Sequence, residues 1–124
     1  MNLHERSAVE LLALYARREC SPLDVARELI AHVDRCEPRL HALWACDRDA
    51  LLAQARESQS RWQRREARAL EGVPVTVKDN IATCGTPTPL GTAATELVPA
   101  AADAPPAARL REAGAMIFAK TTMP

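Results

Sequence analysis

Lysine is rare in this chain, and the position of one lysine points to chemistry. The 16 basic residues divide into 14 arginines and two lysines, Lys78 and Lys120. An arginine stays protonated near neutral pH, whereas burial can make a lysine lose its proton. Lys78 lies in the valine-rich segment 73–79, beside a loop rich in Thr, Gly and Pro. An amine at the end of an apolar strand can be partly desolvated, which makes Lys78 a candidate general base.

A structural interpretation of the same residues competes with this one. A lysine at a strand end is more often a surface or salt-bridge residue than a catalytic one. Asp79, the next residue, could pair with a neighbouring cation. The residue types alone therefore leave the role of Lys78 open.

The cysteines and histidines indicate neither a metal site nor a redox site. Cys20, Cys36, Cys46 and Cys84 form no C-x-x-C pair, so free, buried thiols are expected. His32 and Cys36 lie four residues apart on a predicted helix and could share a metal ion, but two further ligands at suitable spacing are missing. We expect no metal and no organic cofactor.

Residues 1–71 are expected to form an N-terminal helical segment. A capping-box pattern that begins at Ser7 predicts a helix over about residues 8–19. A second helix begins after Ser21, because proline follows at the first helical position and an acid lies in the first turn. Proline disrupts a helix interior, so this helix is expected to end just before Pro38.

A third, longer helix is predicted with Asp47 as its N-cap and Trp62 on its apolar face. The short apolar stretch 40–45 before it fits a strand or a lead-in to the helix. Basic residues outnumber acids along this helix: Arg56, Arg61, Arg64, Arg65 and Arg68 against Glu57 and Glu66. A nucleic-acid-binding helix would have aromatic or glycine residues between the basic ones and a basic domain around it. A solvated helix face is therefore preferred.

Residues 72–124 change to a pattern of strands and loops. The alternation in 73–79 predicts a strand with its valines on one face and Thr76 and Lys78 on the other. Pro74 is expected near the start of this strand or at an unpaired position.

After the loop 83–92, Asp103 is expected to cap a short helix and Gly114 to follow its end. The apolar run 115–119 indicates a buried strand. Helices around a strand–loop–helix–strand unit predict an α/β fold.

Charge and hydropathy exclude some classes of protein. Basic and acidic residues both number 16, so the chain has no formal net charge at pH 7 and no broad attraction to nucleic acid or anionic lipid is expected. No apolar run approaches the roughly 18 residues of a transmembrane helix. The first residues lack the basic-then-apolar layout of a signal peptide, so a cytoplasmic protein is expected.

Several segments of the second half stand in a specific order and spacing. They are Gly72-Val73-Pro74-Val75-Thr76-Val77-Lys78-Asp79-Asn80-Ile81, Gly85-Thr86-Pro87-Thr88, Gly91-Thr92, Asp103-Ala104, Arg109-Leu110-Arg111-Glu112-Ala113-Gly114-Ala115 and Lys120-Thr121-Thr122-Met123-Pro124. In this order they resemble the conserved blocks of the amidase signature family. The helical residues 7–66 are compatible with the N-terminal helices of that family.

The resemblance implies hydrolysis or transfer at an amide carbonyl by a Ser–cis-Ser–Lys triad, with a small-molecule amide as substrate. Lys78 matches the lysine that acts as the ultimate base through a bridging serine. Lys120 matches a second lysine block, which we interpret as structural. Ala119 and Thr122 replace the glycine and asparagine of the common G-K-T-N block, and Thr92 stands where a serine is often found. These substitutions leave the subfamily and the substrate open.

The catalytic serines of the family are not matched. The serines of this chain, Ser7, Ser21, Ser58 and Ser60, all precede Lys78, whereas the family takes both serines and the oxyanion site from a later Gly/Ser-rich segment. The resemblance thus implies the N-terminal part of an amidase, with residues 72–124 as the start of the mixed-sheet core and the domain incomplete. We expect the chain alone to be inactive, marginally stable and prone to aggregation.

Two alternatives accompany this interpretation. The chain could be a non-catalytic module that binds a partner or complements a separate C-terminal piece. Within the family, the A subunit of a glutamyl-tRNA amidotransferase is the alternative to a general amidase. The loop 83–92 and the Ala-rich segment 99–108 favour the general amidase.

Overall fold

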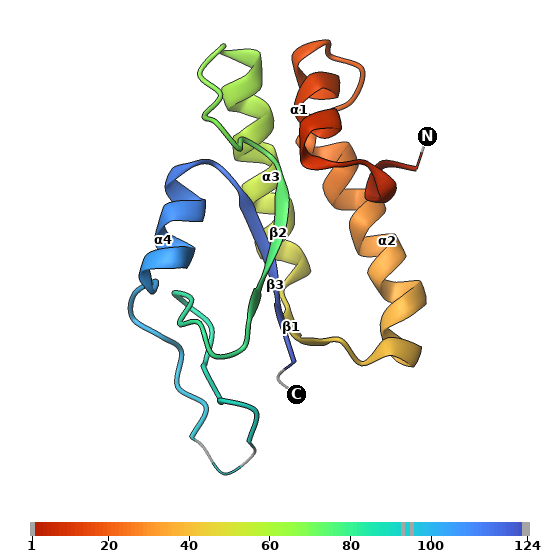
Figure 1. Cartoon of the computed structure of the whole chain (residues 1–124). Coiled ribbons are helices and arrows are strands. Elements are labelled where there is room, and N and C mark those ends of the chain that lie inside the picture. Colours follow the sequence, from red (N-terminus) through yellow and green to blue (C-terminus); the bar gives the residue numbers. More distant parts are fainter. Residues whose placement is uncertain (1, 93, 95, 123–124) are drawn as a thin grey trace.

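The computed structural model describes residues 2–92, 94 and 96–122, and it has the predicted α/β fold (Figure 1). Its elements in chain order are a 3-10 helix η1 (Leu3–Glu5), α1 (Ala8–Ala16), α2 (Pro22–Leu40), β1 (Leu43–Cys46), α3 (Arg48–Gln63), β2 (Pro74–Lys78), α4 (Pro105–Glu112) and β3 (Met116–Thr121).

The predicted N-caps of the first three helices are confirmed. The side chains of Ser7 and Ser21 each accept a hydrogen bond from the backbone N–H three residues later, and both form complete capping boxes. Asp47 caps α3 in the same way through the N–H of Ala50. Local sequence therefore fixes where these helices begin, because each cap satisfies an N–H group that has no partner within the helix.

The predicted helix ends are less accurate. The first helix ends at Ala16, and α2 continues through Pro38 to Leu40. Pro38 and Asp34 are both exposed, so water can solvate the Asp34 carbonyl that the proline leaves without a donor. The third helix ends at Gln63, so the last three arginines of its predicted basic series lie beyond it.

The prediction that Asp103 caps α4 was wrong. The N-cap residue is Ala104, and no side chain caps this helix. The Asp103 carboxylate instead accepts hydrogen bonds of 2.7 Å from the Cys84 backbone N–H and from Nε of Arg111. This carboxylate therefore joins the loop after β2 to the body of α4. Gly114 follows α4 at a φ of +95°, the left-handed conformation expected there.

The three strands form one mixed sheet in the order β1-β3-β2. The central strand β3 pairs in parallel with β2 and antiparallel with β1. Pro74 begins the edge strand β2, a position that a proline tolerates. The expected alternation is confirmed, because Val77 is buried whereas Thr76 and Lys78 are exposed.

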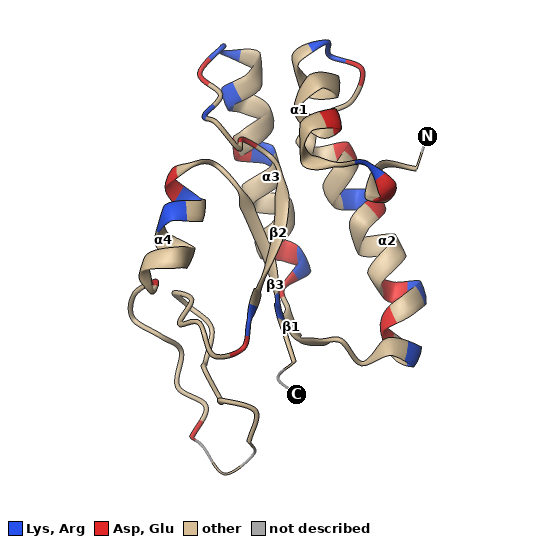
Figure 2. Ribbon diagram, in the orientation of Figure 1, with Lys and Arg blue, Asp and Glu red and all other residues tan. Residues whose placement is uncertain are grey.

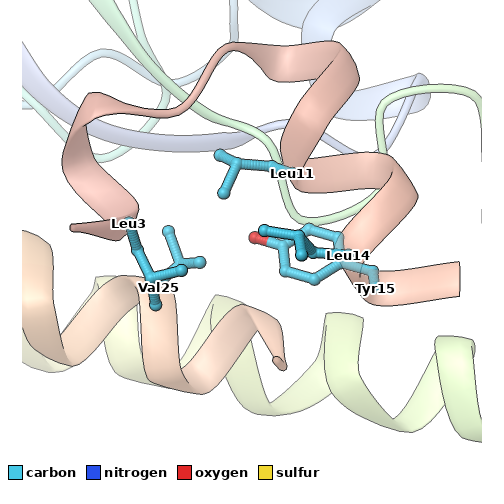
Figure 3. Close-up of a cluster of buried hydrophobic side chains, with 5 residues drawn as sticks. All are labelled: Leu3, Leu11, Leu14, Tyr15 and Val25. Atoms are coloured by element: carbon cyan, nitrogen blue, oxygen red, sulfur yellow. The ribbon is translucent and has the colours of Figure 1, made fainter. Parts of the chain in front are cut away.

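Helices cover both faces of the sheet (Figure 1). On one face, α2 and α3 pack on β3 in a cluster that contains Ala26, Leu51, Ala55 and Met116. On the other face, α4 packs on β2 and β3 through Ala107, Val77 and Ile117. A third cluster joins η1 and α1 to α2 (Figure 3): Leu3, Leu11, Leu14, Tyr15 and Val25.

Candidate active site

Lys78 is the last residue of β2, and its side chain is exposed. In the parallel pairing with β3 it lies opposite Thr121. The expected desolvation of this amine is not found, because β2 is an edge strand and Lys78 lies on the face opposite the buried Val77. The side chain is therefore accessible to groups from outside the described residues.

The buried lysine is Lys120 on the central strand, with 2% of its surface exposed. Its Nζ donates a hydrogen bond of 2.7 Å to the backbone carbonyl of Ile81. Burial lowers the pKa of Lys120, and the nearby Asp79 carboxylate partly opposes that change. Sequence periodicity missed this burial, because it depends on which strand is central in the sheet.

Asp79 is also buried, with 1% of its surface exposed. Its backbone N–H donates to the Thr121 carbonyl at 2.9 Å, and its Oδ2 accepts a hydrogen bond of 2.7 Å from the N–H of Gly91. Its Oδ1 has no hydrogen-bond partner among the described residues. The expected cation partner is thus replaced mainly by a backbone N–H, and the carboxylate anchors the loop to the end of β2.

The loop that follows β2 is almost free of charge. Between Asp79 and Asp103, the sequence carries a single charged residue, Glu96, so the described part of this loop is almost entirely uncharged in Figure 2. A cavity of about 390 Å³ lies beside the strand end, with Trp44, Asp79, Pro89, Gly91, Thr92, Leu97 and Thr122 as its lining. The strand end therefore combines an exposed amine with a nearby cavity that has apolar and polar walls.

Each serine hydroxyl has a partner elsewhere in the structure. Ser7 and Ser21 cap helices, and Ser58 donates a hydrogen bond of 2.6 Å to Glu71. Ser60 accepts a hydrogen bond from Nη1 of Arg64. No hydrogen bond joins any of these hydroxyls to Lys78 among the described residues.

The described residues contain no group of three or more His, Cys, Asp or Glu side chains that could hold a metal ion. His32 Nε2 and Cys36 Sγ lie 3.6 Å apart, the contact expected from their spacing on a helix. All four cysteines are free, but contrary to expectation none is fully buried: three are half-buried and Cys84 is exposed. Cys20 and Cys84 lie in loops, Cys46 ends the edge strand β1, and Cys36 lies in α2 near its end.

Comparison with known proteins identifies the family of this chain. A family model described as Amidase matches residues 24–124. The chain therefore belongs to the amidase signature family.

The relatives and solved structures agree with this assignment. The chain is 38% identical over 98% of its length to the A subunit of a glutamyl-tRNA(Gln) amidotransferase from Nitratidesulfovibrio vulgaris (strain DP4), of which it covers 24%. It is 35% identical over 99% of its length to an acylamidase of Rhodococcus erythropolis, of which it covers 26%. A crystal structure of an amidase superposes on 95% of this chain with a TM-score of 0.86 at 34% identity, and 27% of that structure is covered. The chain thus spans about a quarter of the length of the curated relatives it matches.

No helix in the described part of the chain is long and apolar enough to cross a membrane.

Proposed function

We propose that this chain provides the lysine base of an amidase that hydrolyses carbon–nitrogen bonds by a Ser–cis-Ser–Lys mechanism. The main support for this proposal is the contrast between the two lysines. Lys78 is exposed at a strand end, whereas Lys120 is buried and hydrogen-bonded to a carbonyl. Only Lys78 has an amine that an incoming serine can reach. In its neutral form this amine can accept the proton of a bridging serine, which in turn activates the nucleophile.

The nucleophile and the bridging serine are proposed to come from outside these 124 residues. All four serines here have structural partners, and two of them cap helices. We expect the chain by itself to hydrolyse no amide, because Lys78 has no hydroxyl to activate.

A small amide is the proposed substrate. The cavity beside the strand end has apolar walls from Trp44 and Leu97, and Asp79 is also among its lining residues. The apolar walls suit a hydrocarbon substituent of such an amide.

The test joins this chain to the remaining part of the Rhodococcus erythropolis acylamidase and measures hydrolysis of an anilide. We expect the fusion to be active and the chain alone to be inactive. Lys78→Ala and Lys78→Arg should each lower kcat by about 10²–10⁴-fold, because neither side chain can act as a base. Thr76→Ala is the matched control: it lies on the same exposed face of β2 and should keep activity within about twofold.

Activity that survives Lys78→Ala in the fusion would contradict the proposed role. A folded fusion with no activity at all would favour the second candidate, a non-catalytic module that binds a partner or complements a separate piece. Glutamine-dependent transfer without anilide hydrolysis would favour a component of an amidotransferase. A relative at 38% identity is such a subunit by name.

A further inference from the structure

The cavity of about 390 Å³ at the end of β2 lies at the carboxyl ends of two parallel strands. Asp79 directly follows β2 and Thr122 directly follows β3, and both residues line the cavity. In open α/β sheets, ligands bind preferentially outside the carboxyl ends of the strands. The volume is also within the range of small-molecule pockets, roughly 300–1,000 Å³. The position and the size of this cavity therefore suit part of a small substrate.

Backbone hydrogen bonds hold the walls of this cavity in place. The N–H of Thr122 donates to the carbonyl of Ala42, just before β1, at 2.9 Å. In the loop after β2, the N–H of Gly91 donates to the carboxylate of Asp79 at 2.7 Å, and Gly91 also lines the cavity. These walls are therefore largely formed before a ligand arrives, so binding has to order few groups.

Trp44 is the largest residue of the lining, and it lies at an irregularity of β1. The pairing with β3 passes from Leu43 opposite Thr121 to Ala45 opposite Lys120. Two steps along β1 match one step along β3, which leaves Trp44 as the extra residue of a bulge. Bulges change the direction of a side chain and are frequent next to active sites. The indole is half-buried and lines the cavity, so part of its surface remains open to a ligand.

The charges around the cavity favour a neutral ligand over an anion. Asp79 is the one charged residue among the described lining residues, and its carboxylate is buried. The nearby Lys120 amine interacts with this carboxylate, but it does not line the cavity. The other described walls are uncharged: Trp44, Pro89, Gly91, Thr92, Leu97 and Thr122. An anionic substituent would therefore lose its water in this cavity without gaining a cation as partner.

We propose that Trp44 is a specificity-determining residue of the amidase, and that its indole packs against an uncharged aromatic ring of the substrate amide. This inference rests on the proposed function, because it assigns a subsite to the amide whose cleavage Lys78 assists. Contacts between aromatic rings add affinity beyond that of the buried area. Amides with an anionic group on the ring are disfavoured at this subsite.

The first experiment measures binding by the 124-residue chain and needs no catalysis. Acetanilide, a neutral aryl amide, is compared with 4-acetamidobenzoate, which adds a carboxylate to the same ring. NMR follows the indole N–H signals of Trp44 and of Trp62, which lies on α3 and does not line this cavity. We expect saturable shifts at Trp44 alone, and an affinity for acetanilide at least about fivefold higher than for the anion.

Variants of Trp44 separate an aromatic contact from a merely apolar one. Trp44→Phe keeps a ring and should keep the affinity for acetanilide within about twofold, whereas Trp44→Leu should lower it at least about fivefold. The amide signal of Gly91 reports binding in these variants. Val9→Ala is the matched control, because Val9 is an exposed apolar residue of α1 outside the cavity lining, and it should leave binding unchanged.

A second experiment uses the fusion with the Rhodococcus erythropolis acylamidase described above. Trp44→Leu should raise KM for the anilide at least about fivefold and leave kcat within about twofold, because the ring contact is the same in the ground state and the transition state. Lys78→Ala should instead lower kcat. The two variants therefore separate recognition of the ring from proton transfer.

Equal binding of the two probes would overturn the proposal, and so would shifts at Trp62 rather than Trp44 or the absence of saturation. An unchanged KM of Trp44→Leu in an active fusion would overturn the subsite while leaving amide hydrolysis in place. Saturable binding at Trp44 with an inactive fusion would support the aryl subsite and contradict the hydrolysis. The comparison of the probes on the unmodified chain decides the outcome even if a variant fails to fold.

Discussion

The buried carboxylate of Asp79 accepts a hydrogen bond of 2.7 Å from the backbone N–H of Gly91, twelve residues later. A second tether acts on the same loop, because Lys120 donates to the carbonyl of Ile81. The Asp79 carboxylate and the Lys120 amine are both buried, and both hold the residues that follow the exposed Lys78. The end of β2 is therefore fixed by charged side chains that face inward, while its lysine stays accessible.

Asp79→Ala should lower the free energy of unfolding by about 1–3 kcal/mol, because it leaves the Gly91 N–H without its acceptor. The amide of Gly91 should also exchange its hydrogen faster. Urea denaturation and hydrogen exchange measure these effects. The neighbouring exposed Asn80 gives the control: Asn80→Ala should change stability by about 0.5 kcal/mol or less. Equal effects of the two substitutions would show that Asp79 is no tether.

Lys120 should titrate below the ordinary lysine value of 10.5, since burial lowers its pKa. Because the folded state then binds fewer protons than the unfolded state, Lys120 makes stability rise with pH up to about 10.5. NMR of ¹³C-labelled lysine can read this directly, as the chain has only two lysines. Asp79→Asn should lower the Lys120 pKa further, because the carboxylate raises it. A titration midpoint of Lys120 at or above pH 10.5 would contradict the lowering of its pKa by burial.

Glu71 is fully buried, and its carboxylate accepts hydrogen bonds from Ser58 and Arg68. Burial raises the pKa of Glu71, but these bonds and the Arg68 charge outweigh burial and lower it. Glu71→Gln should cost about 1–3 kcal/mol at pH 7. This stabilisation is present above pH 4.5 and is lost as the pH falls through the lowered pKa, so the variant and the parent should converge in acid.

Urea denaturation at pH 7 and at decreasing pH tests this prediction for Glu71. Glu66→Gln is the control, because Glu66 is an exposed partner of Arg64 and should matter little. If the difference in free energy of unfolding between the parent and Glu71→Gln stays constant as the pH falls, the lowered pKa of Glu71 is contradicted.

Gly72 and Gly85 offer a comparison of two glycines in the same backbone conformation. Their φ angles are +81° and +84°. A Cβ on Gly72 would lie 2.7 Å from Cγ of Pro22, whereas a Cβ on Gly85 meets no atom within 4 Å. Both alanine variants carry the backbone strain of about 1–2 kcal/mol, and only Gly72→Ala adds a steric cost of about 1–3 kcal/mol. Thermal and urea unfolding should therefore rank Gly72→Ala as less stable, and equal values would contradict the close packing.

Local sequence predicted the elements of the fold more accurately than the partners of their side chains. The caps at Ser7, Ser21 and Asp47 and the alternation in β2 were predicted correctly, because each depends on neighbours within a few residues. Asp103 was assigned wrongly, since its acceptor oxygens bind groups 19 residues before it and eight residues after it. Its contacts depend on how the loop returns to the sheet.

The sequence by itself determined the α/β class, the starts of α1, α2 and α3, the strand that ends at Lys78 and, through the order of its motifs, the amidase family. Only the tertiary structure decided which lysine is buried. Lys78 and Lys120 each lie near the end of a strand, but β3 is central and β2 is an edge. Burial of an amine depends on the layers packed around its strand, and these layers come from residues far apart in the chain.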